Sequence, residues 1–209
     1  MRISFHAALL AASMLALPAL AQSPPGIVPP VIPGTPPPTV VPAPPPSAPI
    51  PAAGMPGAPV GPLTASDTAF VRNQLEENAT EIAAAQMALR HSQDQNVRNF
   101  AEKMINDHTY ADNMLLPIAQ PRGIQAPTVL NPEHQAMLDS WAHLEGPAFD
   151  RAYIDAVVLW HGAMINQLND QITHGQSQQI NAWAVNTKPI VQQHYQIGLQ
   201  LAASLPRAG

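Results

Sequence analysis

Apolar residues recur at helical spacing along the C-terminal two thirds of this chain. The clearest series is Val97, Ala101, Met104, His108, Ala111 and Leu115, with steps of three and four residues. This spacing predicts an amphipathic helix that turns one stripe of side chains toward the core. A histidine inside such a stripe is unexpected, because core-facing positions are mostly apolar. Two further helical series carry one histidine each in the same way, His161 and His194.

Capping and stop signals predict two long helices in the first half of this region. Ser-Asp at residues 66–67 is a typical helix N-terminus, and the helix that it opens is expected to run to about His91. Ser92 or Asp94 caps the second helix. That helix is expected to run to about Leu116, where Pro117 and then Pro121-Arg122-Gly123 stop it, because proline lacks the amide hydrogen that a helix interior requires.

The second half of the region carries a short helix and two more long ones. Asn131 is a capping residue followed by proline at the first helical position, and this pair opens a short helix that ends before Gly146. Long helices are expected over about 148–174 and about 177–205. Period-two runs and hairpin signals are absent from the sequence, so no strand is predicted.

Four helices of about 25 residues, joined by two short connections and a long one, predict an all-α fold. The fold class is an antiparallel four-helix bundle with a short extra helix in the second connection. An up-down-up-down order would place the turns near Ser92 and Gly175 at the same end. In that order His108, His161 and His194 lie at depths that differ by about 8 Å, at 1.5 Å per helical residue.

The first 21 residues predict a secretory signal peptide. Arg2 supplies a positive start, an apolar run follows, and Ala-Leu-Ala at residues 19–21 is a typical cleavage signal. No later apolar run approaches the length of a transmembrane helix. The chain has no cysteine, so its domain must be stable without disulfides. We therefore predict an exported soluble protein of the periplasm or cell envelope, with secretion as the alternative.

Residues 22–63 have a different composition from the rest of the chain. This stretch holds 17 of the 25 prolines and no charged residue. Such a sequence has too few amide donors and apolar side chains to build a core, so we expect a disordered linker rich in polyproline II. The simplest role is a spacer. The alternative is a ligand for the aromatic-lined groove of an envelope or cell-wall partner. The folded domain is then residues 64–209.

Charge and motifs exclude several classes of function. Without Arg2, which leaves with the signal peptide, eight Lys and Arg face 14 Asp and Glu, and no basic run occurs. Nucleic-acid binding is therefore not expected. The sequence also lacks a phosphate-binding glycine loop and a nucleophile elbow, which favours a non-catalytic role. The sequence does not indicate an oligomeric state.

Several short elements in residues 66–194 resemble a known family. They are Ser66-Asp67 with Phe70, Glu81, Phe100-Ala101, Met104, Asp107-His108, Phe149-Asp150, Tyr153, His161, Pro189 and His194. In this order and spacing they resemble an exported bacterial family, the domain-of-unknown-function family 4142, some members of which are labelled outer-membrane proteins. The family is similar to ferritin-like helical bundles. The resemblance covers Asp67 to about Leu201 and implies a ferritin-like fold and an export route, without a settled activity.

A ferritin-like fold raises the question of a metal site. Di-iron bundles use Glu-x-x-His motifs, and this chain has none, because Ile105, Val158 and Val191 stand three residues before the three core histidines. A mononuclear site remains open. Its ligands would be His108, His161, His194 and Glu81, with Asp107 and Glu77 as outer partners, and this donor set suits zinc, copper or iron.

The sequence therefore leaves two functions open. The first is a non-catalytic binding or structural role in the cell envelope, in which the three histidines are hydrogen-bonded core residues. The alternative is a metal-binding redox or stress-protective protein with a histidine-rich site in mid-bundle. Asp107 either orients a histidine or pairs with Lys103 four residues earlier. No cofactor is required by the sequence, and a single transition metal is the one candidate.

Overall fold

The computed structural model describes residues 61–206. The predicted signal peptide and nearly all of the proline-rich linker lie outside the described residues. The described part consists of α1 (Ala65–His91), α2 (Gln95–Ala119), the single turn η1 (Gln120–Arg122), α3 (Pro132–Trp141), α4 (Gly146–His174) and α5 (Gln178–Ser204). No strand occurs among these residues. The all-α class is therefore confirmed.

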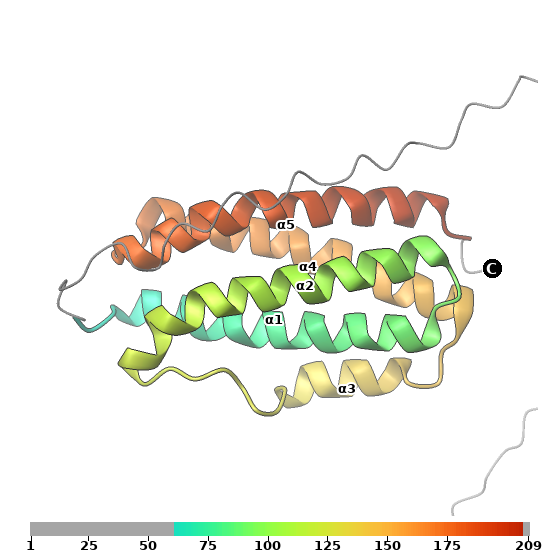
Figure 1. The fold of residues 1–209 in the computed structure, drawn as a ribbon, viewed down its shortest axis with the longest axis horizontal. Coiled ribbons are helices and arrows are strands. Elements are labelled where there is room, and N and C mark those ends of the chain that lie inside the picture. The colour runs from blue at the N-terminus through green and yellow to red at the C-terminus, as the bar shows by residue number, and fades with distance from the viewer. Residues whose placement is uncertain (1–60, 207–209) are drawn as a thin grey trace, which may run out of the picture. The chain divides into compact units, whose positions relative to one another are not determined.

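The four long helices form a bundle, and α3 lies outside it (Figure 1). Helix α1 packs beside α2 and α4, and α5 packs beside the same two helices. All four of these neighbouring pairs are antiparallel, as Figure 1 shows. This arrangement is the ferritin-like four-helix bundle, with the short extra helix α3 in the second connection as predicted.

The helices do not follow the up-down-up-down order considered above, which the sequence alone does not establish. The start of α1 meets the end of α4, where the Asp67 carboxylate accepts hydrogen bonds from Gln171 Nε2 at 2.8 Å and from the Gln176 amide at 3.2 Å. The end of α1 meets the start of α4, where His91 Nδ1 lies 3.0 Å from the Leu144 carbonyl oxygen. The turns near Ser92 and Gly175 therefore lie at opposite ends. The cause is the long connection, which returns along the whole bundle before α4 begins (Figure 1).

Most helix starts follow the predicted capping chemistry. Asp94, Asn131 and Ser177 each accept hydrogen bonds from amides of the first turn that follows. Two helices differ: α4 begins without a side-chain cap, and α1 is capped by Thr64 and not by the Ser-Asp pair. Thr64 Oγ1 accepts from the Asp67 amide at 3.0 Å and donates to the Asp67 carboxylate at 2.9 Å.

Helix α2 passes Pro117, where the first of the two predicted stop signals lies, and stops at the second, Pro121-Arg122-Gly123. The helix continues to Ala119, and the turn η1 follows before Gly123 adopts a φ of 73°. Pro117 is exposed, so the carbonyl group that loses its partner at the proline faces solvent and not the core. The backbone is redirected only at Gly123, where a positive φ favours glycine.

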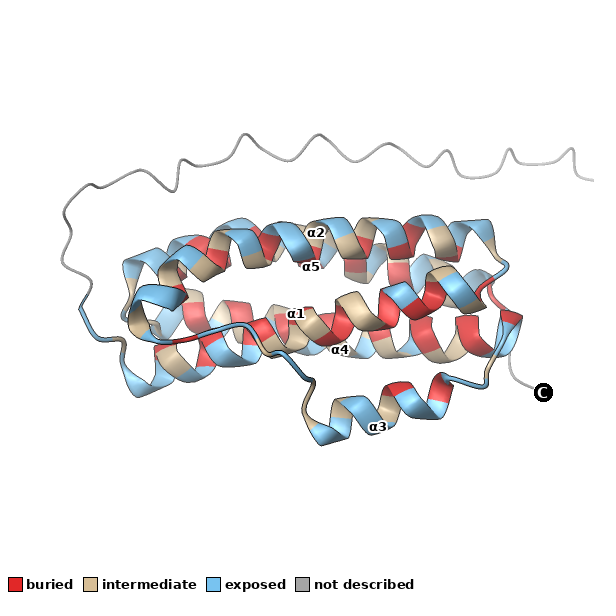
Figure 2. Cartoon of the chain, turned by 60° about the horizontal axis from the view of Figure 1, so that its bottom comes forward, coloured by how far each residue is buried: buried red, intermediate tan, exposed pale blue. Residues whose placement is uncertain are grey.

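The core divides into two apolar clusters with a polar layer between them. One cluster contains Phe100, Met104 and Phe149 and lies toward the turn between α1 and α2. The other contains Leu115 and Leu168 and lies toward the turn between α4 and α5. Figure 2 shows the buried positions following the inner faces of the four helices. Within residues 61–206, no helix has the length and hydropathy required to span a membrane.

Candidate metal centre

The polar layer contains one residue from each helix of the bundle. Glu81 of α1, His108 of α2, His161 of α4 and His194 of α5 each lie within three residues of the midpoint of their helix. We call these four residues the histidine centre. In a bundle of helices of similar length, the midpoints lie at the same height whether two neighbouring helices run parallel or antiparallel. The four residues therefore share one level of the bundle, as predicted, although the helix order is not up-down-up-down.

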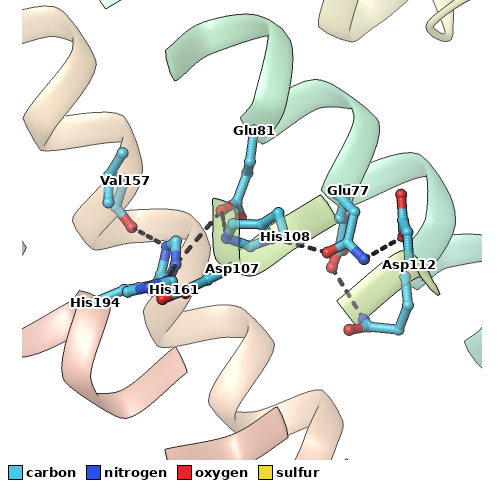
Figure 3. Close-up of polar contacts among 10 residues, drawn as sticks. Glu77, Glu81, Asp107, His108, Asp112, Val157, His161 and His194 are labelled. Carbon is cyan, nitrogen blue, oxygen red and sulfur yellow. Dashed lines mark hydrogen bonds and ion pairs between the residues drawn. The ribbon is translucent and has the colours of Figure 1, made fainter. Parts of the chain in front are cut away.

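The four side chains are buried and point toward one another (Figure 3). Their exposed fractions range from 0 % for His161 to 3 % for His108. Glu81 Oε2 lies 2.8 Å from His108 Nε2 and 3.4 Å from His161 Nε2. His161 Nε2 in turn lies 3.2 Å from His194 Nδ1. One nitrogen from each of the three rings lies within 4.8 Å of the other two.

The outward-facing nitrogens of His161 and His194 are held by hydrogen-bond acceptors. His161 Nδ1 donates to the carbonyl oxygen of Val157 at 3.0 Å (Figure 3). His194 Nε2 donates to the Asp107 carboxylate at 2.8 Å, and Lys103 donates to the same carboxylate oxygen at 2.7 Å. Because a carbonyl or carboxylate oxygen only accepts, both outward nitrogens carry hydrogen.

His108 is held in the same way by an amide. Its Nδ1 lies 2.9 Å from Asn78 Oδ1, while Asn78 Nδ2 donates to the Asp112 carboxylate at 2.6 Å. The Asp112 bond orients the Asn78 amide so that its oxygen faces the ring, and His108 Nδ1 therefore donates. In the neutral form of all three rings, the inward nitrogens are consequently bare lone pairs.

The interior of the centre thus gathers acceptors without the donors to match them. His161 Nε2 and His194 Nδ1 face each other across 3.2 Å, and neither carries hydrogen when its ring is neutral. Glu81 Oε2 and His108 Nε2 lie 2.8 Å apart and form an ion pair when His108 is protonated, but neither atom has a hydrogen bond to any other group. Buried polar atoms in native proteins are nearly all satisfied, so this group requires an explanation.

The charges of the centre follow from burial and from mutual contact. Burial alone would raise the pKa of Glu81, but the His161 and His108 imidazoles outweigh it and lower that pKa to about 2. Burial opposes the charged form of His108, but the Glu81 carboxylate prevails and raises its pKa. Burial lowers the pKa of His161, and lowers that of His194 to about 4 despite its bond to Asp107. Two rings are therefore neutral and present lone pairs.

The spacing of the donor atoms fits a single metal ion. In a tetrahedral site with bonds of about 2.0–2.1 Å, neighbouring donors lie about 3.3–3.4 Å apart. Three of the six donor separations, 2.8, 3.2 and 3.4 Å, are close to this value, and the three ring nitrogens all lie within 4.8 Å of one another, so a small closure of the rings completes the shell. Histidine ligands of metals usually donate their other ring nitrogen to a carboxylate or carbonyl group, as all three do here. The residues present therefore fit one divalent ion.

The two outer residues named from the sequence lie in different places. Asp107 contacts both His194 and Lys103, so the two roles considered for it coexist. Glu77 makes no hydrogen bond to the three rings. Its carboxylate accepts from Gln167 Nε2 at 2.9 Å and from Gln74 Nε2 at 3.1 Å, one helical turn before Glu81.

Sequence reasoning missed two groups that orient the rings. Asn78 was not considered, although it lies three residues before Glu81 on the buried face of α1, and a buried Asn at such a position is a usable signal. The other group is the backbone carbonyl of Val157, and because every residue has such a carbonyl, the sequence gives no indication of its role. Its role becomes visible only from the ring orientation of His161.

Comparison with known proteins identifies the fold and leaves the chemistry open. The family described as Domain of unknown function (DUF4142) matches residues 52–201. No curated protein matches the chain. A DUF305 fragment from Deinococcus radiodurans is similar in structure, with a TM-score of 0.62, 15 % identity, and coverage of 69 % of this chain and 100 % of that one. A putative spore coat protein from Bacillus halodurans C-125 has a TM-score of 0.54 and 12 % identity, with coverage of 71 % and 96 %.

Proposed function

The chain belongs to the DUF4142 family, and we propose that this member binds a single divalent transition-metal ion in the core of its bundle. His108 Nε2, His161 Nε2, His194 Nδ1 and Glu81 Oε2 would hold the ion. The proposal keeps the non-catalytic character that the sequence favours and names the ligand as a metal.

One observation supports this function above the others. The inward nitrogens of three imidazoles, two of them lone pairs of neutral rings, and a carboxylate oxygen converge within the core, while the outer nitrogens of all three rings are committed to acceptors. In a purely structural cluster, the inward atoms would be expected to pair as donors with acceptors. A divalent cation satisfies all four inward atoms together, because each supplies one electron pair.

The donor set narrows the choice of ion and the kind of role. Three imidazoles and one carboxylate suit zinc, copper or iron, whereas calcium and magnesium prefer sites made of oxygen alone. Four protein donors complete a tetrahedral shell, and all four residues are buried. A closed shell of this kind is typical of sites that hold a metal, since catalytic sites keep one position for water or substrate. We infer a role in metal holding or sequestration.

The test is metal titration of the chain after chelator treatment, without an added histidine tag. Zinc(II) and copper(II) chloride are titrated separately by calorimetry. The expected result is one ion per chain in the wild type and in His174→Leu, because His174 is exposed and lies outside the centre. His161→Leu is expected to lose binding. The absence of binding in the wild type, or equal binding in His161→Leu, would contradict the proposal.

We also propose that the bundle operates after export, in the periplasm or envelope or outside the cell. The support is in the sequence: the positive start at Arg2, the apolar run and the Ala-Leu-Ala signal at residues 19–21. The proline-rich stretch would then space the bundle from an envelope partner. Mass spectrometry of the protein from a fractionated host tests this setting. A mature N-terminus at Gln22 is expected, and an uncleaved cytoplasmic chain would contradict it.

A further inference from the structure

The histidine centre needs a route for its ion, because its four residues are almost completely buried. An ion cannot cross the two apolar clusters that flank the centre without a large desolvation cost. A pocket of about 70 Å³ lies on the α1–α4 side of the bundle, where α3 begins. Its lining residues are Glu77, Thr80, Glu81, His134, Trp160 and Ala163. The pocket therefore includes one residue of the centre itself.

We propose that this pocket is the route by which a divalent metal cation reaches the histidine centre, with Glu77 as its first binding group and Glu81 as the second. The inference rests on the proposed metal-binding function. Glu81 is common to both places, since it lines the pocket and its Oε2 faces His108 and His161. A cation that reaches Glu81 from the pocket is already in contact with the centre.

The residues that line the pocket differ in solvent exposure, from exposed at the surface to buried at the core. Ala163 is exposed, Glu77 and His134 are half-buried, and Glu81 is 2 % exposed. The carboxylates of Glu77 and Glu81 stand one helical turn apart on α1, so they form two steps on the same face. Two carboxylates in a narrow pocket favour cations over anions.

The pocket is large enough for a partly hydrated ion. A cavity needs about 10–15 Å³ of water-accessible space to hold one water, so about 70 Å³ has room for several waters or for an ion with part of its shell. Helix α3 borders the pocket through His134, whose Nδ1 lies 2.8 Å from Thr80 Oγ1. The Asn131 amide donates to the Glu76 carboxylate at 2.8 Å, which anchors the same end of α3 to α1.

The route is tested by the kinetics of cobalt(II) binding, followed by its visible absorption in a stopped-flow instrument with the full chain. Ala163→Trp fills the mouth of the pocket from an exposed position. It is expected to slow association and dissociation at least tenfold, with the Kd unchanged within about threefold. Ala69→Trp, at an exposed alanine near the start of α1, is the matched control and should keep both wild-type rates.

A second variant tests the carboxylate step without adding bulk. Glu77→Gln removes one negative charge and is expected to slow association at least threefold with little change in the Kd. Wild-type rates in both Ala163→Trp and Glu77→Gln would overturn the route while leaving the metal-binding function intact. Failure of the wild-type chain to bind cobalt(II) or zinc(II) at all would overturn both proposals.

Discussion

Two of the groups of buried polar residues in the bundle differ in their hydrogen bonding. One is the histidine centre at mid-height. The other, which we call the Asp67 network, lies where α1 begins and α4 ends, and consists of Thr64, Asp67, Gln171 and Asn181 with the Gln176 backbone amide. Both place an ionisable carboxyl group in the core.

In the Asp67 network, donors and acceptors match. Asp67 Oδ1 accepts from Gln171 and from the Gln176 amide, and Oδ2 accepts from Thr64. Gln171 also donates to Asn181, which donates in turn to the Gly175 carbonyl oxygen at 2.8 Å. The network joins the start of α1 to the turn between α4 and α5. Its geometry is accounted for by folding alone.

In the histidine centre, the outward ring nitrogens have hydrogen-bond acceptors, whereas the inward nitrogens of His161 and His194 have no donor. The outer ring nitrogens are held as firmly as the atoms of the Asp67 network, while the inward nitrogens of His161 and His194 face each other at 3.2 Å with no hydrogen between them when both rings are neutral. The proposed metal site rests on this combination of fixed outer nitrogens and unmatched inward atoms. This difference predicts opposite responses to metals and to mutation.

The largest expected effect is stabilisation by metal. At free zinc(II) one thousandfold above the Kd, binding stabilises the fold by about 4 kcal/mol. In a domain of this size this raises the Tm by roughly 8–16 °C. Calorimetry should show the shift in the wild type and in Asp67→Asn, but not in His161→Leu. A shift in all three proteins would place the ion outside the histidine centre.

The next effect is loss of stability when the Asp67 network is broken. Asp67→Ala leaves the Gln171 and Gln176 donors without their acceptor and removes the bond to Thr64. We expect a loss of about 2–4 kcal/mol in the free energy of unfolding, measured by urea denaturation. Thr64→Ala, which removes a single cap, should cost about 1 kcal/mol. A loss below 0.5 kcal/mol in Asp67→Ala would show that the network is not needed for folding.

A smaller effect is expected for Glu81→Gln without metal. The amide retains the shape of the carboxylate, and its NH₂ group supplies the donor that the inward lone pairs lack. The free energy of unfolding should therefore change by less than about 1 kcal/mol in either direction, whereas the metal response is lost. A loss of several kcal/mol in the metal-free protein would instead make Glu81 a structural residue like Asp67.

The smallest effect concerns the pH dependence of the Asp67 network. Burial would raise the pKa of Asp67, but hydrogen bonds from Gln171, Thr64 and the Gln176 amide outweigh it and lower the pKa below 3.8. A depressed folded pKa gives stability that is present above the ordinary value and lost as the pH falls through the folded value. The stability difference between the wild type and Asp67→Asn should therefore shrink below about pH 4. A difference that stays constant from pH 6 to pH 2 would contradict this assignment.

The fold and the level of the centre were within reach of sequence reasoning. Capping residues such as Asp94 and Asn131 have local chemistry that is independent of the rest of the chain. His108 and His161 could be placed at one level because each lies close to the midpoint of a helix of similar length. These properties depend only on helical periodicity and length.

The direction of the second helix pair and the partners of the histidines could not be predicted. The path of residues 123–131 depends on how that connection packs against α1, which no local pattern encodes. The Val157 carbonyl and the Asn78 amide act through orientation, and ring orientation follows from packing among several helices. The pocket beside α3 was missed for the same reason, because His134 reaches it only through the path of the connection.

The most direct test of the metal centre is anomalous diffraction from crystals of the zinc-loaded chain at the zinc absorption edge. The account predicts one strong peak at mid-bundle, about 2.0–2.1 Å from His108 Nε2, His161 Nε2, His194 Nδ1 and Glu81 Oε2. Peaks found only at surface histidines such as His174, with none among these four atoms, would contradict it.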